Sequence, residues 1–342
     1  MGSIQTSTGP VPQVSSSLFW QDYLGTWKAR WGIGRMHYRI EPGLYALGVP
    51  DEKSPVLVTA NYKMSFDKLR KELPDRNFWI LVLDTKGINV WCSAGKGTFG
   101  KTELVNRIAS SGLSQIVSHR ELILPQLAGP GVAAHEVKRL SGFKVIYGPI
   151  RSKDLPAFLD SGHNATPEMR LKTFPLWERM ALIPMELVSA MKVGLVLTGV
   201  FFFLAFIWRS GEATAVAFSH GLFSALALFI AIVAGAILSP LLLPWLPGRA
   251  FSLKGSVLGL IAAFLLVAFC FKEFDTLGGR VEMFAWVLLI PAVSAYLAMN
   301  FTGSSTYTSL SGVKREMRWA LPFEIGAVVI GLLLWIASHL IA

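Results

Sequence analysis

The hydrophobic pattern divides the chain into a half with short apolar runs and a half with long ones. In the first half, runs typical of buried strands alternate with segments of helical spacing. Strands are expected at 54–60, 78–84, 115–117, 122–124 and 145–147, and helices at 64–73, 103–110, 133–140 and 153–159. This alternation predicts a doubly wound, Rossmann-like α/β domain on a parallel sheet, which binds ligands beyond the carboxyl ends of its strands.

The second half contains five apolar stretches that reach or nearly reach the ~20 residues needed to cross a bilayer. They cover residues 182–208, 213–243, 255–271, 281–300 and 321–341. Tryptophans lie at or near their ends, as interfacial aromatic residues do. The chain is therefore expected to have four parts, which are a disordered leader at 1–17, an α/β domain at 18–166, a connector at 167–181, and an all-α transmembrane domain at 182–342.

The amino-terminal region carries no targeting signal that we recognise. Residues 1–17 are small and polar, without the apolar core of a signal peptide. Residues 18–48 mix aromatic side chains with Gly and Arg at spacing that fits a helix poorly, so we expect an entry segment packed on the edge of the sheet.

The charge of the chain is uneven. Residues 1–180 hold 23 of the 32 Lys and Arg residues but 15 of the 22 Asp and Glu residues. Because positive segments stay in the cytoplasm, we expect the α/β domain there and the five spans in the inner membrane. Such a surface suits anionic membrane lipid or an acidic partner such as a ferredoxin. The sequence has no basic stripe with interleaved aromatic residues, so we do not expect it to bind nucleic acid.

Apolar spans also contain ionisable residues, which are functional candidates by default because charges are costly in lipid. These residues are Glu186, Lys192, His220, Glu282 and Glu324. The hydroxyl-rich loop at 300–319 is a candidate docking surface.

One stretch of the α/β half concentrates candidate chemistry. Residues 89–102, NVWCSAGKGTFGKT, follow the apolar run at 78–84 and a turn at Lys86-Gly87, and a helical pattern comes next. Cys92 therefore lies where an extended segment gives way to a helix. The other cysteine, Cys270, lies in the apolar half, so we expect no disulfide, as in a reducing cytoplasm.

Three interpretations of this stretch remain open. Cys92 can be a small buried hydrophobe, as many single cysteines are. Gly95-x4-Gly100-Lys101-Thr102 fits a phosphate-binding loop, although no downstream apolar strand ends in the carboxylate that a nucleoside-triphosphatase needs. A thiolate with no second cysteine nearby builds no zinc or iron–sulfur site, but it suffices as one axial ligand to a metal that arrives in a macrocycle.

Residues 89–104, NVWCSAGKGTFGKTEL, resemble the cap-helix signature of corrinoid-binding domains, and their cysteine matches the mercury-methylating corrinoid protein family (HgcA). Residues 41–70, 122–159 and 173–187 are similar to the corrinoid domain of the large subunit of the corrinoid iron–sulfur protein. In those soluble relatives this position is not a ligand. A cysteine there, followed by a membrane tail, is typical of the mercury branch.

The resemblance implies a methyltransferase with a cobalamin-type corrinoid. The Cys92 thiolate would be the lower axial ligand of the cobalt, and the methyl group of methyl-Co(III) would pass to Hg(II), forming methylmercury. Two alternatives are a membrane-anchored corrinoid methyl carrier of one-carbon metabolism and a nucleoside-triphosphatase with a phosphate-binding loop.

The resemblance and the sheet-edge positions together nominate the corrinoid-binding residues. Gly95 and Gly97 would allow close backbone approach. Val90 and Trp91 would form an apolar wall, and Lys96 would bond the cofactor's phosphate or keep the thiolate ionised. Neighbouring Thr and Asn side chains would bond the corrin amides. The full set is Thr59, Asn61, Asn89, Val90, Trp91, Cys92, Ser93, Ala94, Gly95, Lys96, Gly97, Thr98, Gln126, Gly131, His135 and Gly148.

Partners follow from what this sequence lacks. With two cysteines, the chain carries no iron–sulfur cluster, so the cobalt must be reduced from outside. The resemblance implies a ferredoxin-like iron–sulfur protein that donates electrons and can carry Hg(II), together with a folate-linked methyl donor system.

Overall fold

The computed structural model describes residues 2–208, 214–270, 275–304 and 310–341. The chain forms two compact units. The first contains Met1–Ala29 and Ile33–Lys172, and the second contains Arg30–Gly32 and Thr173–Ala342. The middle of the predicted loop at 300–319 lies outside the described residues.

The first unit is built on a seven-stranded sheet of order β1-β2-β3-β5-β4-β6-β7. The strands are β1 (Ser3–Thr6), β2 (Gly9–Val14), β3 (Gly43–Leu47), β4 (Val56–Ala60), β5 (Phe78–Leu83), β6 (Glu121–Leu124) and β7 (Lys144–Tyr147). Strands β5, β4, β6 and β7 are parallel. β4 and β5 are buried along their whole length, because helices cover both of their faces.

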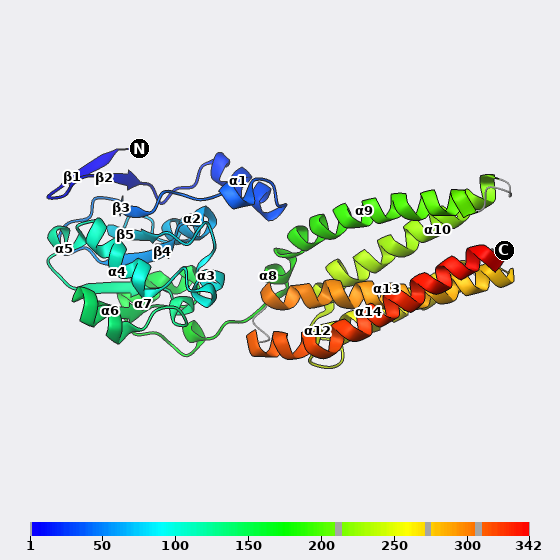
Figure 1. The fold of residues 1–342 in the computed structure, drawn as a ribbon. Coiled ribbons are helices and arrows are strands. Elements are labelled where there is room, and N and C mark those ends of the chain that lie inside the picture. The colour runs from blue at the N-terminus through cyan, green and yellow to red at the C-terminus, as the bar shows by residue number, and fades with distance from the viewer. Residues whose placement is uncertain (1, 209–213, 271–274, 305–309, 342) are drawn as a thin grey trace. The chain divides into compact units, whose positions relative to one another are not determined.

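Helices pack on both faces of the parallel strands, as Figure 1 shows. On one face, α2 (Lys63–Lys71) and α7 (Leu155–Asp160) share a core with Leu57, Ile80 and Ile123. On the other, α4 (Lys101–Ser110) and α6 (Ala134–Ser141) share a core with Val58 and Leu81. The predicted α/β architecture with helices on both faces is therefore present. The remaining short helices of this unit are α1 (Trp20–Arg30), η1 (Arg35–His37), α3 (Val90–Lys96), α5 (Leu113–Ile116), η2 (Gln126–Ala128), η3 (Ser152–Asp154) and η4 (Glu168–Arg170).

The sheet is mixed, whereas the pattern predicted a parallel one. β3 runs antiparallel to β5, and β1 runs antiparallel to β2. The expected disordered leader is wrong, because its residues form the β1–β2 hairpin. Gln13 and Val14 pair with β3, and Val11 and Val14 are buried. Strand pairing thus orders a segment whose own composition is too polar to signal a strand.

Two other elements differ from the sequence expectations. The stretch at 115–117 was expected to be a strand, but Leu113–Ile116 is a short helix, α5. Leu113, Ile116 and Val117, three and four residues apart, all reach the core, which is helical spacing. The entry segment at 18–48 contains the eleven-residue helix α1 and strand β3, neither of which was expected.

The order of the parallel strands places a switch point between β4 and β6. From β4 the chain moves to β5 on one side, and then crosses to β6 on the other. Ligands of doubly wound sheets bind in the crevice that this reversal leaves outside the carboxyl ends. The segments that follow β4, β5, β6 and β7 therefore delimit the candidate site.

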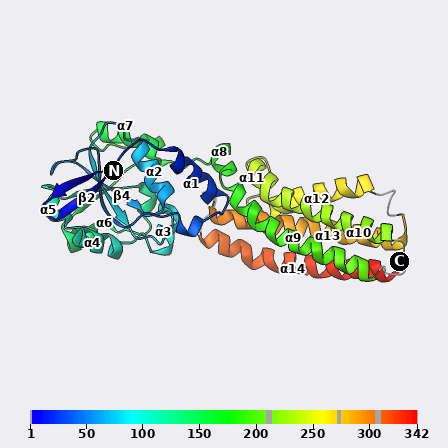
Figure 2. The ribbon, with the colours of Figure 1, turned by 90° about the horizontal axis from the view of Figure 1, so that it is seen from above.

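Among its described residues, the second unit has five helices long and apolar enough to cross a membrane. They are Leu176–Ile207, Ala215–Leu242, Phe251–Cys270, Leu277–Asn300 and Ser311–Ile341. Figure 2 shows the long helices of this bundle side by side. The bundle's elements are α8 (Leu176–Met180), α9 (Ile183–Trp208), α10 (Thr214–Ile232), η5 (Val233–Leu238, a π-helix), α11 (Ser239–Leu242), α12 (Phe251–Cys270), α13 (Leu277–Asn300), η6 (Phe301–Ser304) and α14 (Leu310–Ile341).

All five expected spans are thus helices of sufficient length and apolarity. The last helix begins at Leu310, earlier than the expected span at 321, because the basic turns before it continue the helix. Part of the expected connector at 167–181 is helical, since α8 lies within it.

Three of the five ionisable residues predicted in the spans are buried, namely His220, Glu282 and Glu324, whereas Lys192 is exposed and Glu186 is partly exposed. His220 of α10 contacts the carboxylate of Glu282 on α13, and the exposed fractions of the two residues are 7% and 0%. Glu324 is also buried, on α14. Polar side chains that are buried together can fix the register in which two helices pack. We therefore take the His220–Glu282 contact as a feature that fixes how α10 meets α13.

Acidification is expected to loosen the contact of α1 with α2. Burial raises the pKa of Asp22, but hydrogen bonds from the Lys63 ammonium and the Phe19 amide outweigh it, so the pKa lies below its usual value of 3.8. A lowered carboxyl pKa stabilises the fold above the unfolded value, and this stability is lost as the pH falls through the folded pKa. We expect the protection of the α1 amides, measured relative to their intrinsic exchange rates at each pH, to fall progressively below about pH 5. Its pH dependence should flatten in Asp22→Asn, and an unchanged profile in that variant would contradict the assignment.

Candidate functional site

A short helix, α3, lies just beyond the carboxyl end of β5. Asn89 begins it in an extended conformation, and its side-chain oxygen accepts a hydrogen bond of 2.9 Å from the Cys92 amide. Gly97 ends it in the left-handed conformation, at φ 81°. An Asn cap and a left-handed Gly are standard helix boundaries, so residues 89–97 encode α3 locally.

The two sides of α3 have different environments. Ser93 and Ala94 are buried, and the Ser93 hydroxyl donates to the Asn89 carbonyl oxygen at 2.6 Å. Trp91 and Gly95 are exposed, and Cys92, a free thiol, is partly exposed. A methyl group at Gly95 would have no neighbour within 4 Å. Cys92 therefore lies on the outward side of the helix, beside a surface that Gly95 keeps clear.

Asn61 organises the turn that leads from β5 to α3. Its side-chain oxygen accepts hydrogen bonds from the Thr85 amide (3.1 Å), the Thr85 hydroxyl (2.9 Å) and the Gly87 amide (3.0 Å). Its amide nitrogen donates to Asp84. Asn61 is 1% exposed. The predicted contact of Asn61 with corrin amides is not what the structure shows, because the side chain is engaged in positioning the turn.

Thr85 was not among the predicted site residues, although it completes this turn. Thr85 is fully buried, and its one hydroxyl proton is shared between the Asn61 side-chain oxygen and the Ile88 carbonyl oxygen, which lies at 2.6 Å. Lys86 and Gly87 both have positive φ, 59° and 71°. The Asp-Thr-Lys-Gly sequence after a buried strand was the available signal for a constrained turn.

The segment after β6 packs against the buried side of α3. At Gly131 an added methyl group would lie 2.2 Å from the Phe99 carbonyl oxygen and 3.0 Å from that of Ala94. Only glycine permits this approach of backbone to backbone. Gly131 thus packs against the buried side of α3. Its predicted contact with a corrinoid stays a prediction.

Gly131→Ala is expected to displace α3. The added methyl group overlaps the Phe99 carbonyl, and overpacking of this kind costs about 1–3 kcal/mol. We expect lower thermal stability of the first unit and faster hydrogen exchange in α3, measured on the full chain in detergent. Equal exchange rates in the variant and the wild type would show that the loop yields without moving the helix.

The other predicted residues do not converge on Cys92 through any contact that the structure shows. Thr59 is buried in β4. Gln126 accepts a hydrogen bond from Arg170, and the Gly148 amide donates to the Leu124 carbonyl oxygen at 2.8 Å. His135 is exposed on α6.

Residues flanking the thiol also differ in role from one another. Val90 packs against the core, so Trp91 is the exposed apolar residue of the predicted wall. The Thr98 hydroxyl donates to the Ser93 carbonyl oxygen at 3.5 Å, and Lys96 is exposed in the last turn of α3. Trp91, Cys92, Gly95 and Lys96 therefore form the accessible surface of the helix.

The geometry is not that of a phosphate-binding loop. Such a loop wraps backbone amides around phosphates between a strand and a helix. Here Gly95 lies inside α3, where backbone amides serve the helix. Lys101 forms an ion pair with Glu136 at 2.5 Å. The nucleoside-triphosphatase alternative therefore has no structural support in this segment.

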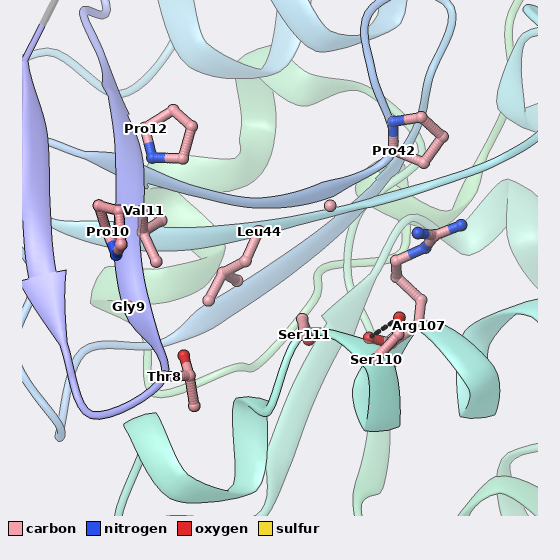
Figure 3. A pocket seen from close by; sticks show the side chains of 11 residues that line it. Thr8, Gly9, Pro10, Val11, Pro12, Pro42, Leu44, Arg107, Ser110 and Ser111 are labelled. Atoms are coloured by element: carbon pink, nitrogen blue, oxygen red, sulfur yellow. Dashed lines mark hydrogen bonds between the residues drawn. The ribbon is translucent and has the colours of Figure 1, made fainter.

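A separate pocket of about 290 Å³ opens beside the β1–β2 hairpin, where α4 ends (Figure 3). Its lining includes Pro10, Pro12, Pro42 and Arg107. The Arg107 guanidinium is held by Glu103 at 2.7 Å. None of the predicted site residues lines this pocket.

The exposed side of α3 presents one thiol, that of Cys92, as a candidate metal ligand. Over the described residues, no group of three or more His, Cys, Asp or Glu side chains is placed to hold a metal ion directly. A corrinoid brings its own equatorial nitrogen ligands, so a single thiolate from Cys92 would complete the lower side. Gly95, one turn along the helix, adds no side chain that would obstruct such a ring.

The first unit is similar in sequence to known proteins. Residues 34–159 match the model of the CO dehydrogenase/acetyl-CoA synthase delta subunit family, CdhD. The gamma subunit of the acetyl-CoA decarbonylase/synthase complex of Methanopyrus kandleri is 36% identical over 123 residues, covering 35% of this chain and 26% of that protein. The same subunit of Methanocaldococcus jannaschii is 34% identical over 122 residues, covering 35% and 25%.

The match is confined to one part of each protein. The chain spans about a quarter of the length of these relatives, and the five long helices lie outside the matched residues. Residues 34–159 are therefore similar to the CdhD family and to part of the gamma subunit of acetyl-CoA decarbonylase/synthase.

Proposed function

We propose that this chain is a membrane-anchored corrinoid protein that carries and transfers methyl groups, with the Cys92 sulfur as the lower ligand of cobalt. The observation that carries the proposal is the position of Cys92. It lies on the open side of a capped helix at the carboxyl edge of the sheet, in a domain homologous to subunits of a methyl-handling complex. The cofactor performs the chemistry, and the protein supplies a ligand, orientation and electrostatics.

The residues around Cys92 hold its sulfur in position. Asn89 and Ser93 fix the first turn of α3, and Gly131 allows the loop beneath it to pack closely. A thiolate held there donates electron density to cobalt. When bound, a corrinoid supplies a cobalt ion that releases its methyl group together with the bonding electrons.

We further propose that Hg(II) is the acceptor of the methyl group. It is an electrophile and takes a methyl group with both bonding electrons. The support is the cysteine at position 92 on a chain with five membrane-length helices among its described residues, a combination that resembles the mercury-methylating family. The relatives found by comparison belong to an acetyl-CoA decarbonylase/synthase complex, and this favours a carrier of one-carbon metabolism as the alternative.

Renewed activity requires electrons from another protein. The 342 residues contain two cysteines, fewer than the four thiolates that usually hold an iron–sulfur cluster. We propose a ferredoxin-like iron–sulfur partner, which can also deliver Hg(II), and a folate-linked methyl donor. The partners would meet the α/β domain in the cytoplasm, with the five helices in the inner membrane.

The absorption spectrum of the corrinoid-loaded full chain tests the ligand. Wild-type protein should show a sulfur-to-cobalt charge-transfer band that Cys92→Ser lacks, while Cys270→Ser serves as the matched control and keeps it. Identical spectra for the wild type and Cys92→Ser would remove Cys92 as the ligand.

A second measurement separates the two acceptors. Protein methylated on its corrinoid is mixed with Hg(II) or with a thiol acceptor, and the methylated products are quantified. Formation of methylmercury supports the mercury assignment. Transfer to the thiol alone would be consistent with a methyl carrier and would overturn mercury as the substrate.

Gly95→Ala gives a prediction of opposite sign for stability and for binding. Alanine is favoured over glycine inside a helix by about 1 kcal/mol, and the new methyl group meets nothing within 4 Å. We therefore expect equal or higher thermal stability but weaker corrinoid binding, because the methyl group would enter the space beside Cys92. Unchanged corrinoid affinity, measured by titration of the apoprotein, would show that the ring lies elsewhere.

A further inference from the structure

Helix α1 has one side that packs on the domain. An added methyl group at Gly25 would lie 2.7 Å from the Tyr38 ring, and Thr26 shares a hydrogen bond of 3.2 Å with the Tyr38 hydroxyl. Ala29 is fully buried, and Asp22 forms an ion pair with Lys63 of α2. Asp22, Gly25, Thr26 and Ala29 are three and four residues apart, so they lie on one side of the helix.

The opposite side of α1 is a stripe of exposed aromatic residues. Trp20 is 71% exposed, Tyr23 57% and Trp27 54%, and Phe19, just before the helix, is 56% exposed. Residues 20, 23 and 27 are three and four apart and therefore share one side. Exposed aromatic side chains rarely gather in this way on a surface that only water covers.

The charges around the stripe are basic. Within residues 18–40, Asp22 is the only acidic residue, and it lies on the packed side. Lys28 and Arg39 are exposed. This segment therefore presents aromatic and positively charged groups to whatever it meets.

We propose that the aromatic side of α1 lies in the headgroup region of a bilayer containing anionic lipid. Trp and Tyr favour this region because their rings are apolar at one end and hydrogen-bond at the other. The five long helices on the same chain bring a bilayer within reach. The proposal needs the bundle to be in a membrane, but it does not depend on the corrinoid.

Spin labels on the full chain test the proposal. Single cysteines are introduced at Tyr23 on the stripe and at Gln21, an exposed residue of the same helix on another side, with Cys92 and Cys270 replaced by Ser. In nanodiscs of phosphatidylglycerol and phosphatidylcholine, the label at 23 should become accessible to oxygen and lose access to a water-soluble nickel chelate. The label at 21 should keep its access to the chelate.

A third label and a change of lipid make the outcomes distinct. Leu195, on α9 and 74% exposed, should be in contact with lipid if the bundle is inserted. A label at 195 that meets the chelate throughout would contradict the membrane bundle itself. A lipid-immersed label at 195 with a water-exposed label at 23 would overturn the present inference alone. Shielding of position 23 from both reagents would indicate a protein partner and would also overturn it. In nanodiscs of phosphatidylcholine alone, the protection at 23 should weaken, since the basic flanks lose their anionic partner.

Discussion

Cys92→Ala is expected to reduce methyl transfer by at least about a hundredfold, at the upper end of what loss of support at a metal site costs. The cysteine contributes little to folding, because its side chain is partly exposed and its backbone amide keeps the hydrogen bond to Asn89. Surface substitutions of this kind change stability by about 0.5 kcal/mol or less. Activity and stability should therefore separate clearly in this variant.

The measurement is the rate of a single turnover with methylated protein and excess acceptor. Cys270→Ala is the matched control, because Cys270 lies at the end of α12 in the other unit. This variant should transfer its methyl group at the wild-type rate. A Cys92→Ala protein that still transferred its methyl group at the full rate would end the assignment of sulfur as the ligand. Retention of bound corrinoid in the variant would show that the effect is on reactivity and not on loading.

Arg70→Met is expected to destabilise the first unit by about 3–5 kcal/mol, because it leaves buried charge without its partner. Arg70 is 3% exposed and donates to Asp67 at 2.9 Å and to Asp22 at 2.8 Å. It also donates to the carbonyl oxygens of Ser15 and Ser17, at 2.6 Å and 2.8 Å. One side chain thus joins α1, α2 and the segment after β2.

Hydrogen exchange of the β4 and β5 amides is the suitable readout, because a chain of two units does not unfold in one step. Arg76→Met is the control. Arg76 pairs with Asp160 at 2.7 Å, but the pair is exposed, and exposed ion pairs contribute little to stability. Similar exchange in the two variants would mean that the Arg70 network contributes no more than a surface pair.

Only the first of the two units overlaps the residues matched by known relatives. The α/β domain has relatives in an acetyl-CoA decarbonylase/synthase complex, whereas the five long helices lie outside those matches. Attachment to a membrane, at the long helices and as proposed at α1, would hold the α/β domain close to a bilayer surface.

Local sequence determined the elements whose signals lie within one or two turns of chain. Asn89 and Gly97 cap α3 from inside the same nine residues, so this helix is encoded locally, although an extended segment was expected there and a helix only from 103. The buried strands at 56–60 and 78–83 and the five long helices follow from unbroken apolar runs. These features depend on hydrophobicity and capping, which act between neighbours in sequence.

Tertiary contacts decided the rest. The β1–β2 hairpin is ordered by pairing with β3. The Asn61 side chain accepts hydrogen bonds from the turn at 84–87, a contact that no sequence signal predicted. Gly131 is required because the Phe99 carbonyl, far from it in sequence, comes within reach of its missing side chain. His220 and Glu282 meet across 62 residues. Hydrogen bonds and close packing between distant segments depend on where the whole chain brings them, and no local pattern encodes that.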